Sequence, residues 1–349
     1  MTKIEPDIKL DYSDVLLAPS ESKINSRKDI DLTIPLRNGT RVVPIVAANM
    51  DHVGTFEMAK EFAKHKIMTA LVKHYSNLEI SNFLNENPLV APYIFVSMGA
   101  NHEDEEKIGD LFFGKELKQM PMGICIDVAN GYTSNFLKMV KSIHFMYRKQ
   151  LIIMAGNVVT AQRSQELFSL GIDFVKIGIG PGSVCTTRCE TGIGYPQFSA
   201  VLECSKVANI CADGGIQNPG DVVKSLAAGS SLVMVGGEFA GHNEGYTRKE
   251  LYSGSDLSIK RNKLPYYGMA SRKAQILHNG GVADYRTSEG KEVWIEPKGS
   301  VSNTISHYLG GLRSGMSYIG VDNLESLRKG YYPITFVKVN RILNNKFYD

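Results

Sequence analysis

The stretch FVKIGIGPGSVCTT (residues 174–187) starts as an apolar run and turns into a glycine-rich loop. Apolar runs without alternation are typical of parallel β-strands that are buried on both faces. The loop that follows carries small residues and one cysteine, so it contributes nothing to a hydrophobic core. A buried strand that ends in a polar, glycine-rich loop is the unit from which α/β folds are built.

The same unit recurs along the chain. Segments with helical spacing lie between most of the runs, and those at 161–171 and 219–229 end on glycine, a favoured helix stop. Eight strand–helix repeats predict a (β/α)8 TIM barrel, whereas a doubly wound sheet would usually show a GxGxxG turn, which is absent here. The other seven apolar runs are VPIVAANM (43–50), IMTALVKHY (67–75), YIFVSMGA (93–100), GICIDVAN (123–130), LIIMAGNV (151–158), NICADGG (209–215) and LVMVGGEF (232–239).

The barrel pattern predicts one domain over residues 1–349 with two additions. Residues 1–42 form an N-terminal extension, in which Arg37 to Thr40 (RNGT) indicates a hairpin or tight turn. Residues 241–299 form a long polar insertion after the eighth strand, before a helical pattern at 300–315. Loops of this length tend to be lids or binding loops, so we expect a flap here.

Composition excludes several classes of protein. The net charge is only +3, and the densest basic run, KRNK (260–263), is short and lacks interleaved aromatic residues, so no nucleic-acid partner is expected. No apolar stretch is long enough to span a membrane, and the first residues show no secretory signal. Five cysteines without a CxxC pair argue against a disulfide framework or a structural zinc site. These features predict a reduced, cytoplasmic protein.

Three glycine clusters end the last three strands: GPGS (180–183), DGG (213–215) and GG (236–237). In a barrel the loops after the last strands commonly bind phosphate, because glycine lets backbone N–H groups approach a ligand. Tight turns also need glycine for geometry alone, but three consecutive clusters favour a phosphate site. Asp213, an acceptor at the end of the seventh strand, could bind ribose hydroxyls.

Cys185 is the sharpest chemical feature of the sequence. A thiolate is a strong nucleophile, and the loop's N–H groups and Arg188 could stabilise it. We therefore interpret Cys185 as a nucleophile and Cys125, Cys204 and Cys211 as core residues, and leave the role of Cys189 open. A nucleophile beside a phosphate site indicates covalent chemistry on a phosphorylated small molecule. A sugar-phosphate lyase or isomerase is an alternative, with Lys176 either a Schiff-base lysine or packed inside the barrel.

The string GIGPGSVCTTR, followed by TGIGYPQ, resembles the family of inosine monophosphate dehydrogenase and guanosine monophosphate reductase. The resemblance runs from about residue 8 to about residue 340. Its other motifs are AANMDHVGTFEMA, KHYS, DVANGY, AGNVVT, DGGI, GDVVKSLAAG, MVGGEFAGH, YGMAS and DYRTSEGK.

Within that family the chain resembles the reductase branch. Dehydrogenases typically carry a regulatory insertion of over a hundred residues after the second strand, but here only seventeen residues separate Tyr75 from Tyr93. Dehydrogenases also place an Arg-Tyr pair on the flap, and no arginine here is followed by tyrosine. The resemblance implies NADPH-dependent reduction of GMP to IMP, with release of ammonia, in purine salvage. A dehydrogenase without its regulatory insertion and a non-catalytic nucleotide sensor are the alternatives.

The resemblance also implies roles for individual residues. Cys185 would attack purine C2, and Thr187 with Glu289 would move the proton that ammonia needs to leave. The implied GMP-binding residues are Ser183, Asp213, Gly214, Gly215, Gly236, Gly237, Gly268, Met269, Ala270 and Arg286. The implied NADPH-binding residues are Ser26, Arg27, Lys73, Asp127, Val128, Ala129, Tyr285, Ser314, Gly315, Met316 and Ser317, the last four from a neighbouring subunit of a homotetramer. The implied potassium-binding residues are Gly180, Gly182, Cys185 and Arg188.

Overall fold

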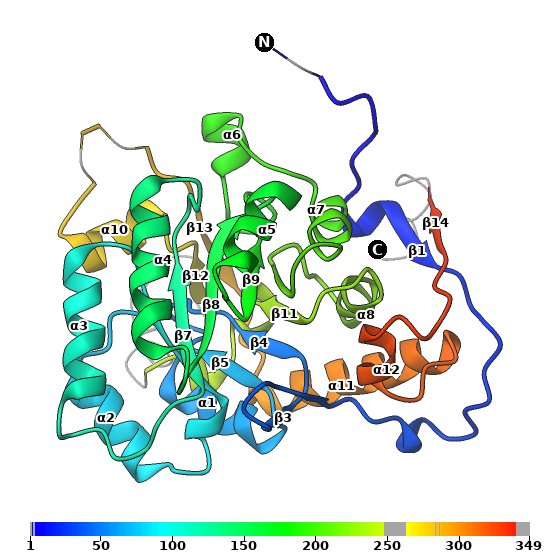
Figure 1. Cartoon of the computed structure of the whole chain (residues 1–349), viewed down its shortest axis with the longest axis horizontal. Helices are drawn as coiled ribbons and strands as arrows, with labels where there is room; N and C mark the ends of the chain where they lie inside the picture. The colour runs from blue at the N-terminus through cyan, green and yellow to red at the C-terminus, as the bar shows by residue number, and fades with distance from the viewer. Residues whose placement is uncertain (1, 3, 248–262, 283, 286, 340–349) are drawn as a thin grey trace.

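The computed structural model describes residues 2, 4–247, 263–282, 284, 285 and 287–339. Eight parallel strands close into a barrel in the order of the sequence, which confirms the predicted (β/α)8 architecture (Figure 1). Each strand lies within the apolar run that predicted it. The strands are β4 (Ile45–Ala47), β5 (Met68–Ala70), β6 (Ile94–Met98), β7 (Gly123–Asp127), β8 (Ile152–Val158), β9 (Phe174–Ile177), β10 (Ile210–Asp213) and β11 (Leu232–Val235).

Helices cover the outside of the barrel, and most of them bury apolar side chains. The predicted segments at 161–171 and 219–229 are helical, and Gly171 and Gly229 end them with φ of 92° and 104°. The helices between barrel strands are α1 (Phe56–Lys64), α2 (Asn77–Glu86), α3 (His102–Phe113), α4 (Ser134–Tyr147), α5 (Ala161–Ser169), α6 (Thr187–Thr191), α7 (Gln197–Cys204) and α8 (Pro219–Ala227). The helix α11 (Val301–Tyr318) packs between α8 and α1 and completes the layer.

The N-terminal extension contains the predicted hairpin, in which β2 (Ile34–Pro35) pairs with β3 (Arg41–Val42). It also contains a pairing that the sequence did not indicate: β1 (Val15–Leu17) runs antiparallel to β14 (Phe336–Lys338). The extension is thereby joined to the segment that follows α11 and α12 (Leu324–Arg328). Short 3-10 helices complete the described elements: η1 (Tyr12–Asp14), η2 (Arg27–Asp29), η3 (Ala91–Tyr93), η4 (Gly237–Phe239) and η5 (Asn243–Gly245).

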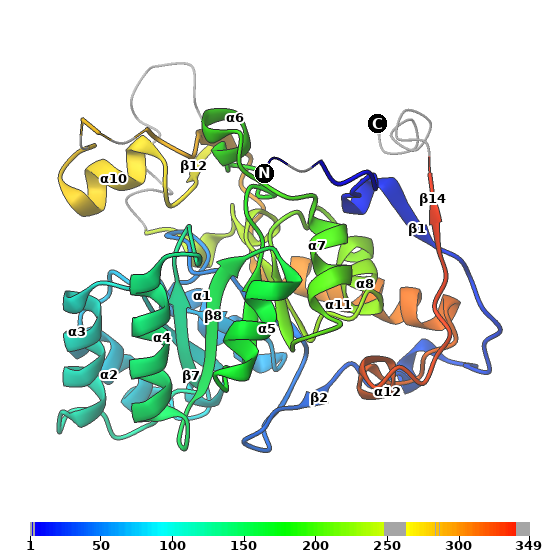
Figure 2. The same ribbon diagram turned by 45° about the horizontal axis from the view of Figure 1, so that its top comes forward.

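The insertion after β11 contains regular secondary structure. Its described part holds a two-stranded antiparallel sheet, β12 (Leu264–Tyr267) with β13 (Glu292–Ile295), and the helix α10 (Arg272–Asn279) between the two strands. Three of the four β12 residues are buried, so this strand is largely shielded from solvent. Figure 2 shows α10 and β12 on the same side of the barrel as α6. Of the basic run at 260–263, residues 260–262 lie outside the described residues.

None of the described helices combines the length and the apolarity that crossing a membrane needs.

Candidate active site

The loop between β9 and α6 holds Cys185 at the carboxyl end of the barrel. Gly180 adopts φ of 86°, a left-handed conformation that glycine adopts without strain, and a side chain there would meet the Arg188 side chain at 2.6 Å. Arg188 itself donates to the carbonyl of Tyr195 at 2.6 Å and pairs with Asp11 at 3.3 Å. The arginine therefore supports the loop from behind, and its guanidinium is engaged with other partners than the thiol.

A chain of hydrogen bonds connects the thiol to an acid on the insertion. The Cys185 Sγ lies 3.2 Å from Thr187 Oγ1, and that hydroxyl donates to Glu289 Oε2 at 2.8 Å. Cys185 and Glu289 are more than a hundred residues apart in the sequence, yet one hydroxyl connects them. A hydroxyl can accept a proton from the thiol while it gives its own to the carboxylate. The arrangement can therefore move a proton between the thiol region and Glu289.

Main-chain hydrogen bonds fix the segment that carries Glu289. The Thr186 N–H donates to the Glu289 carbonyl at 2.9 Å, and the Lys291 N–H donates to the Val184 carbonyl at 2.9 Å. Gly290 thereby forms isolated bridges with Cys185 and with Ser271. These contacts are made by the backbone, so they do not depend on the side chain of residue 289 itself.

The three predicted glycine clusters converge as expected. A Cβ atom on Gly237 would lie 3.0 Å from Ser183 Oγ and 3.3 Å from the hydroxyl of Tyr266, and one on Gly214 would lie 2.8 Å from Pro181. The backbone of Gly237 and the hydroxyls of Ser183 and Tyr266 therefore lie close together. Tyr266, on β12, is a member that the sequence gave no signal to find. This composition fits a phosphate group.

A buried lysine binds two carboxylates at the mouth of the barrel. Lys176 Nζ lies 2.9 Å from Asp127 Oδ1 and 2.5 Å from Asp213 Oδ2. Asn49 donates to Asp127 Oδ2 at 2.9 Å, and Asn157 donates to Asp213 Oδ2 at 2.8 Å. Asp213 Oδ1 accepts no hydrogen bond from the described residues, so one carboxylate oxygen is left for a ligand hydroxyl. That arrangement fits the predicted ribose contact.

The electrostatics of this network decide the role of Lys176. Burial alone would lower the pKa of Lys176, but the carboxylates of Asp127 and Asp213 raise it well above its ordinary value. Burial would likewise raise the pKa of Asp127, and the Lys176 ammonium holds it below the ordinary 3.8. A Schiff base requires a neutral amine. Lys176 therefore stays charged, packs inside the barrel, and is not the lysine of a lyase.

Replacing this lysine should be costly. We expect Lys176→Met to lower the free energy of unfolding at pH 7 by about 2 kcal/mol, because it leaves two partly buried carboxylates without a cation. The depressed pKa of Asp127 makes its contribution present above its unfolded pKa and lost as the pH falls through its folded pKa. Without the ammonium, protonation becomes favourable, so the deficit should shrink as the pH is lowered towards 4. Urea titrations at several pH values measure this, and a deficit independent of pH would contradict it.

The cysteines divide as the sequence predicted. Cys125, Cys204 and Cys211 are buried, whereas Cys185 is partly exposed. Burial raises the pKa of Cys204 to about 11 and that of Cys125 to about 12, and it raises the pKa of Cys211 well above the ordinary value. These three remain thiols at neutral pH. Cys189, whose role the sequence left open, is exposed on α6.

The predicted cation-binding residues offer carbonyl oxygens in one loop. Within the described part of the chain, the carbonyls of Gly180 and Cys185 accept no backbone N–H, whereas those of Gly182 and Arg188 accept the N–H groups of Cys185 and Gly192. A carbonyl that already accepts one hydrogen bond keeps a second lone pair. The oxygens therefore fit a hard monovalent cation. The same described residues contain no cluster of three His, Cys, Asp or Glu side chains placed to hold a metal ion.

The predicted cofactor residues lie in two places. Lys73 follows β5, Asp127 is the last residue of β7, and Val128 and Ala129 come directly after it, so both groups are at the barrel mouth. Tyr285 is an exposed residue of the insertion. Ser26 and Arg27 lie at η2, which packs against α11, the helix that carries residues 314–317 on the outside of the barrel. Met316 is fully buried, while Ser314 and Ser317 are partly exposed. Within one chain, α11 therefore does not contribute to the mouth. Arg286 lies outside the described residues.

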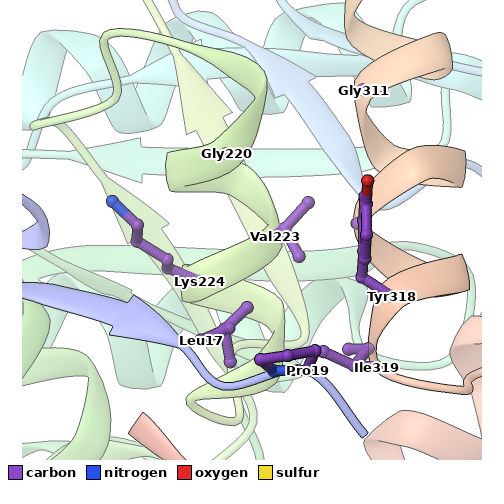
Figure 3. Close-up of a pocket in the computed structure, with 9 residues that line it drawn as sticks. Leu17, Pro19, Gly220, Val223, Lys224, Gly311, Tyr318 and Ile319 are labelled. Carbon is purple, nitrogen blue, oxygen red and sulfur yellow. The ribbon is translucent and has the colours of Figure 1, made fainter. Parts of the chain in front are cut away.

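A cavity of about 290 Å³ lies between α8, α11 and the N-terminal extension (Figure 3). Gly315 lines it together with Val223, Tyr318 and Leu17. None of its lining residues belongs to the Cys185 loop. The cavity is therefore separate from the thiol, and of the second group of predicted cofactor residues it includes Gly315 alone.

Comparisons with known proteins agree on one family. The model of the IMP dehydrogenase / GMP reductase domain matches residues 9–84 and 98–342. The chain is 44% identical to a protein named GMP reductase from Phytophthora infestans, over 99% of this chain and 95% of that protein. It is also 44% identical to human GMP reductase 2, over 99% of each chain. A protein named GMP reductase from Caenorhabditis elegans is 44% identical over 99% of this chain and 96% of its own length.

Proposed function

This chain belongs to the IMP dehydrogenase / GMP reductase family, and we propose that it catalyses the NADPH-dependent reduction of GMP to IMP and ammonia. The observation that carries the proposal is the chain of contacts from Cys185 through Thr187 to Glu289. The reaction needs a nucleophile that makes a temporary bond to purine C2 and an acid that protonates the departing amine. One connected set of side chains supplies both.

The site supports a defined placement of the nucleotide. The phosphate would lie against Ser183, Gly236 and Gly237, where Tyr266 adds a hydroxyl. The ribose would bind the free oxygen of Asp213. The purine would then extend beneath the turn of the insertion at residues 268–270, next to the Cys185 loop that it contacts. A Cβ atom on Gly268 would lie 3.0 Å from the Val184 carbonyl, so this turn and the loop are in direct contact.

The chemistry proceeds in two steps. The Cys185 thiolate forms a bond to C2 of the purine, and the 2-amino group leaves as ammonia after it accepts a proton that Glu289 delivers through Thr187. The remaining thioimidate links C2 to sulfur. Bound NADPH supplies the hydride that reduces C2. The carbon–sulfur bond then breaks, which releases IMP and returns Cys185 as a thiolate. Splitting one difficult displacement into two easier steps is the advantage of the covalent route.

Two cationic side chains support the choice of NADPH. Lys73 at the mouth and Arg27 beside α11 are exposed, and either could meet the extra phosphate of NADPH. Because Lys73 and Arg27 are on different parts of one chain, one dinucleotide would reach both only where α11 of a neighbouring copy approaches the mouth. This supports a homo-oligomer, which we propose to be a tetramer. A potassium ion at the carbonyls of Gly180 and Cys185 would stiffen the thiol loop.

The decisive assay measures NADPH consumption with GMP and quantifies IMP and ammonia. We expect all three changes in equal amounts. Formation of NADH from IMP and NAD⁺, without GMP reduction, would instead indicate a dehydrogenase, and nucleotide binding without turnover in either direction would indicate a sensor.

Free thiols at all five cysteines are typical of a reducing compartment, so we propose a cytoplasmic enzyme of purine nucleotide interconversion and salvage.

The phosphate cradle can be tested by filling it. We expect Gly237→Ala to raise the KM for GMP about tenfold or more, because its methyl group would occupy the space between Ser183 Oγ and the Tyr266 hydroxyl. Gly310→Ala on α11 is the matched control, since a Cβ atom there meets nothing within 4 Å. Initial rates against GMP concentration measure both variants. An unchanged KM in Gly237→Ala would place the phosphate elsewhere.

A further inference from the structure

One carboxylate oxygen holds two parts of the insertion against the barrel. Asp51 follows β4 at the mouth, and its side chain is only 12% exposed. Its Oδ2 accepts the hydroxyl of Tyr267 at 2.7 Å and lies 2.7 Å from Nε2 of His278. Asp51 is none of the residues that the family resemblance assigns a role, and the reaction as proposed above does not use it.

These two partners enclose the turn that holds the catalytic acid. Tyr267 is the last residue of β12, and His278 lies in the last turn of α10. Between them, the carbonyl of Ala270 accepts the Glu289 N–H at 3.2 Å, and the N–H of Ser271 donates to Gly268 at 2.9 Å. Asp51 therefore fixes both ends of the segment to which the backbone of Glu289 is bound.

A second ring completes the contact. The imidazole of His74 stacks on His278 with the ring centroids 3.5 Å apart and the planes 3° from parallel. Partial burial and the neighbouring His278 lower the pKa of His74 to about 4, and Lys73 and Lys107 act in the same direction. His74 is thus neutral at physiological pH and can lie face to face with His278 without charge repulsion. The loops after β4 and β5 both hold α10.

We propose that Asp51 is a positioning residue that keeps Glu289 on Thr187 by binding Tyr267 and His278 at the two ends of the intervening turn. The inference rests on the proposed reductase function for its catalytic consequence. The cause is geometric: without the carboxylate, β12 and α10 are no longer fixed to the same point of the barrel. Glu289 would then lose the support that aligns it with the Thr187 hydroxyl.

The test uses Asp51→Asn, which keeps the size of the side chain and removes the charge that both donors share. We expect kcat to fall about 10- to 100-fold, the change that corresponds to loss of a charge-assisted hydrogen bond. Trp294 gives a readout that is independent of activity, because it is the single tryptophan of the chain and lies on β13 opposite Pro265 of β12. Its emission should shift to the red, and acrylamide should quench it more readily.

The matched control is Asp322→Asn. Asp322 also accepts a tyrosine hydroxyl, from Tyr332 at 2.7 Å, but it lies just before α12, which Figure 2 shows on the opposite side of the molecule from α10. This variant should leave kcat and the Trp294 emission unchanged. If Asp51→Asn folds poorly, Tyr267→Phe removes one of the two donors only and should give a smaller change in the same direction.

A double-mutant cycle separates positioning from general destabilisation. If Asp51 acts through Glu289, Asp51→Asn should cost little further kcat in a Glu289→Gln background. Additive losses would overturn the proposal, as would an Asp51→Asn enzyme with unchanged kcat or a loss of kcat with no change at Trp294. Should the wild type fail to reduce GMP, the proposed function fails on its own assay, while the Trp294 measurements still decide whether Asp51 holds the insertion.

Discussion

Cys185→Ala is expected to abolish turnover, with a loss of about 10⁴-fold or more in kcat. Without the sulfur no bond to purine C2 can form, and nothing else in the described site can replace it as a nucleophile. The phosphate cradle and Asp213 are untouched by the substitution, so the affinity for GMP should change little. Steady-state rates and equilibrium GMP binding measure the two quantities separately.

Cys189→Ala provides the matched control for this experiment. Cys189 is an exposed thiol four residues further along the same loop and helix, so it reports on the loss of a sulfur near the site without loss of the nucleophile. It should keep wild-type turnover. Substantial GMP reduction by Cys185→Ala, or equal losses in the two variants, would show that the covalent route is wrong.

Glu289→Gln should have the second largest effect, a fall in kcat of about 10²- to 10⁴-fold, the range typical of a lost general acid or base. Glutamine can still accept the hydroxyl of Thr187, but it cannot take up or deliver the proton. The segment should stay in place, because Thr186 binds the carbonyl of residue 289 and Lys291 binds Val184 through the backbone. The KM for GMP should therefore change much less than kcat.

The control for this variant is Glu292→Gln, an exposed acid three residues further on, in β13. It changes the charge of the same segment without touching Thr187, so its kcat should match the wild type. A fall in kcat/KM that comes only from a higher KM in Glu289→Gln would mean that the residue binds substrate and does not move a proton. Rapid-quench measurement of ammonia release would locate the slowed step before hydride transfer.

Most of the fold could be predicted because the information is local. Each barrel strand is a run of apolar residues buried on both faces, and each such run can be recognised without reference to the rest of the chain. The glycines at 171 and 229 ended helices as expected, since only the residue type at that position is needed for the left-handed turn. The hairpin at Arg37 to Thr40 followed from its turn residues in the same way.

The candidate site was predictable in part. The glycine clusters and Cys185 could be assigned from the sequence, because a barrel brings the ends of its parallel strands to one face. Glu289 was expected only through resemblance to a family, since an acid on a polar loop gives no local signal. Its hydrogen bond to Thr187 joins residues 102 positions apart in the chain.

The sequence by itself determined the barrel, the order of its strands and the loop that carries the nucleophile, because hydrophobic pattern and turn residues act over a few positions. Only the tertiary structure decided that Lys176 is a charged bridge between Asp127 and Asp213, that β1 pairs with β14, and that Asp51 holds the insertion. Each of these contacts depends on which side chains meet after the barrel has closed. The sequence does not show which partner a charged or polar residue will contact, because the folded chain determines that contact.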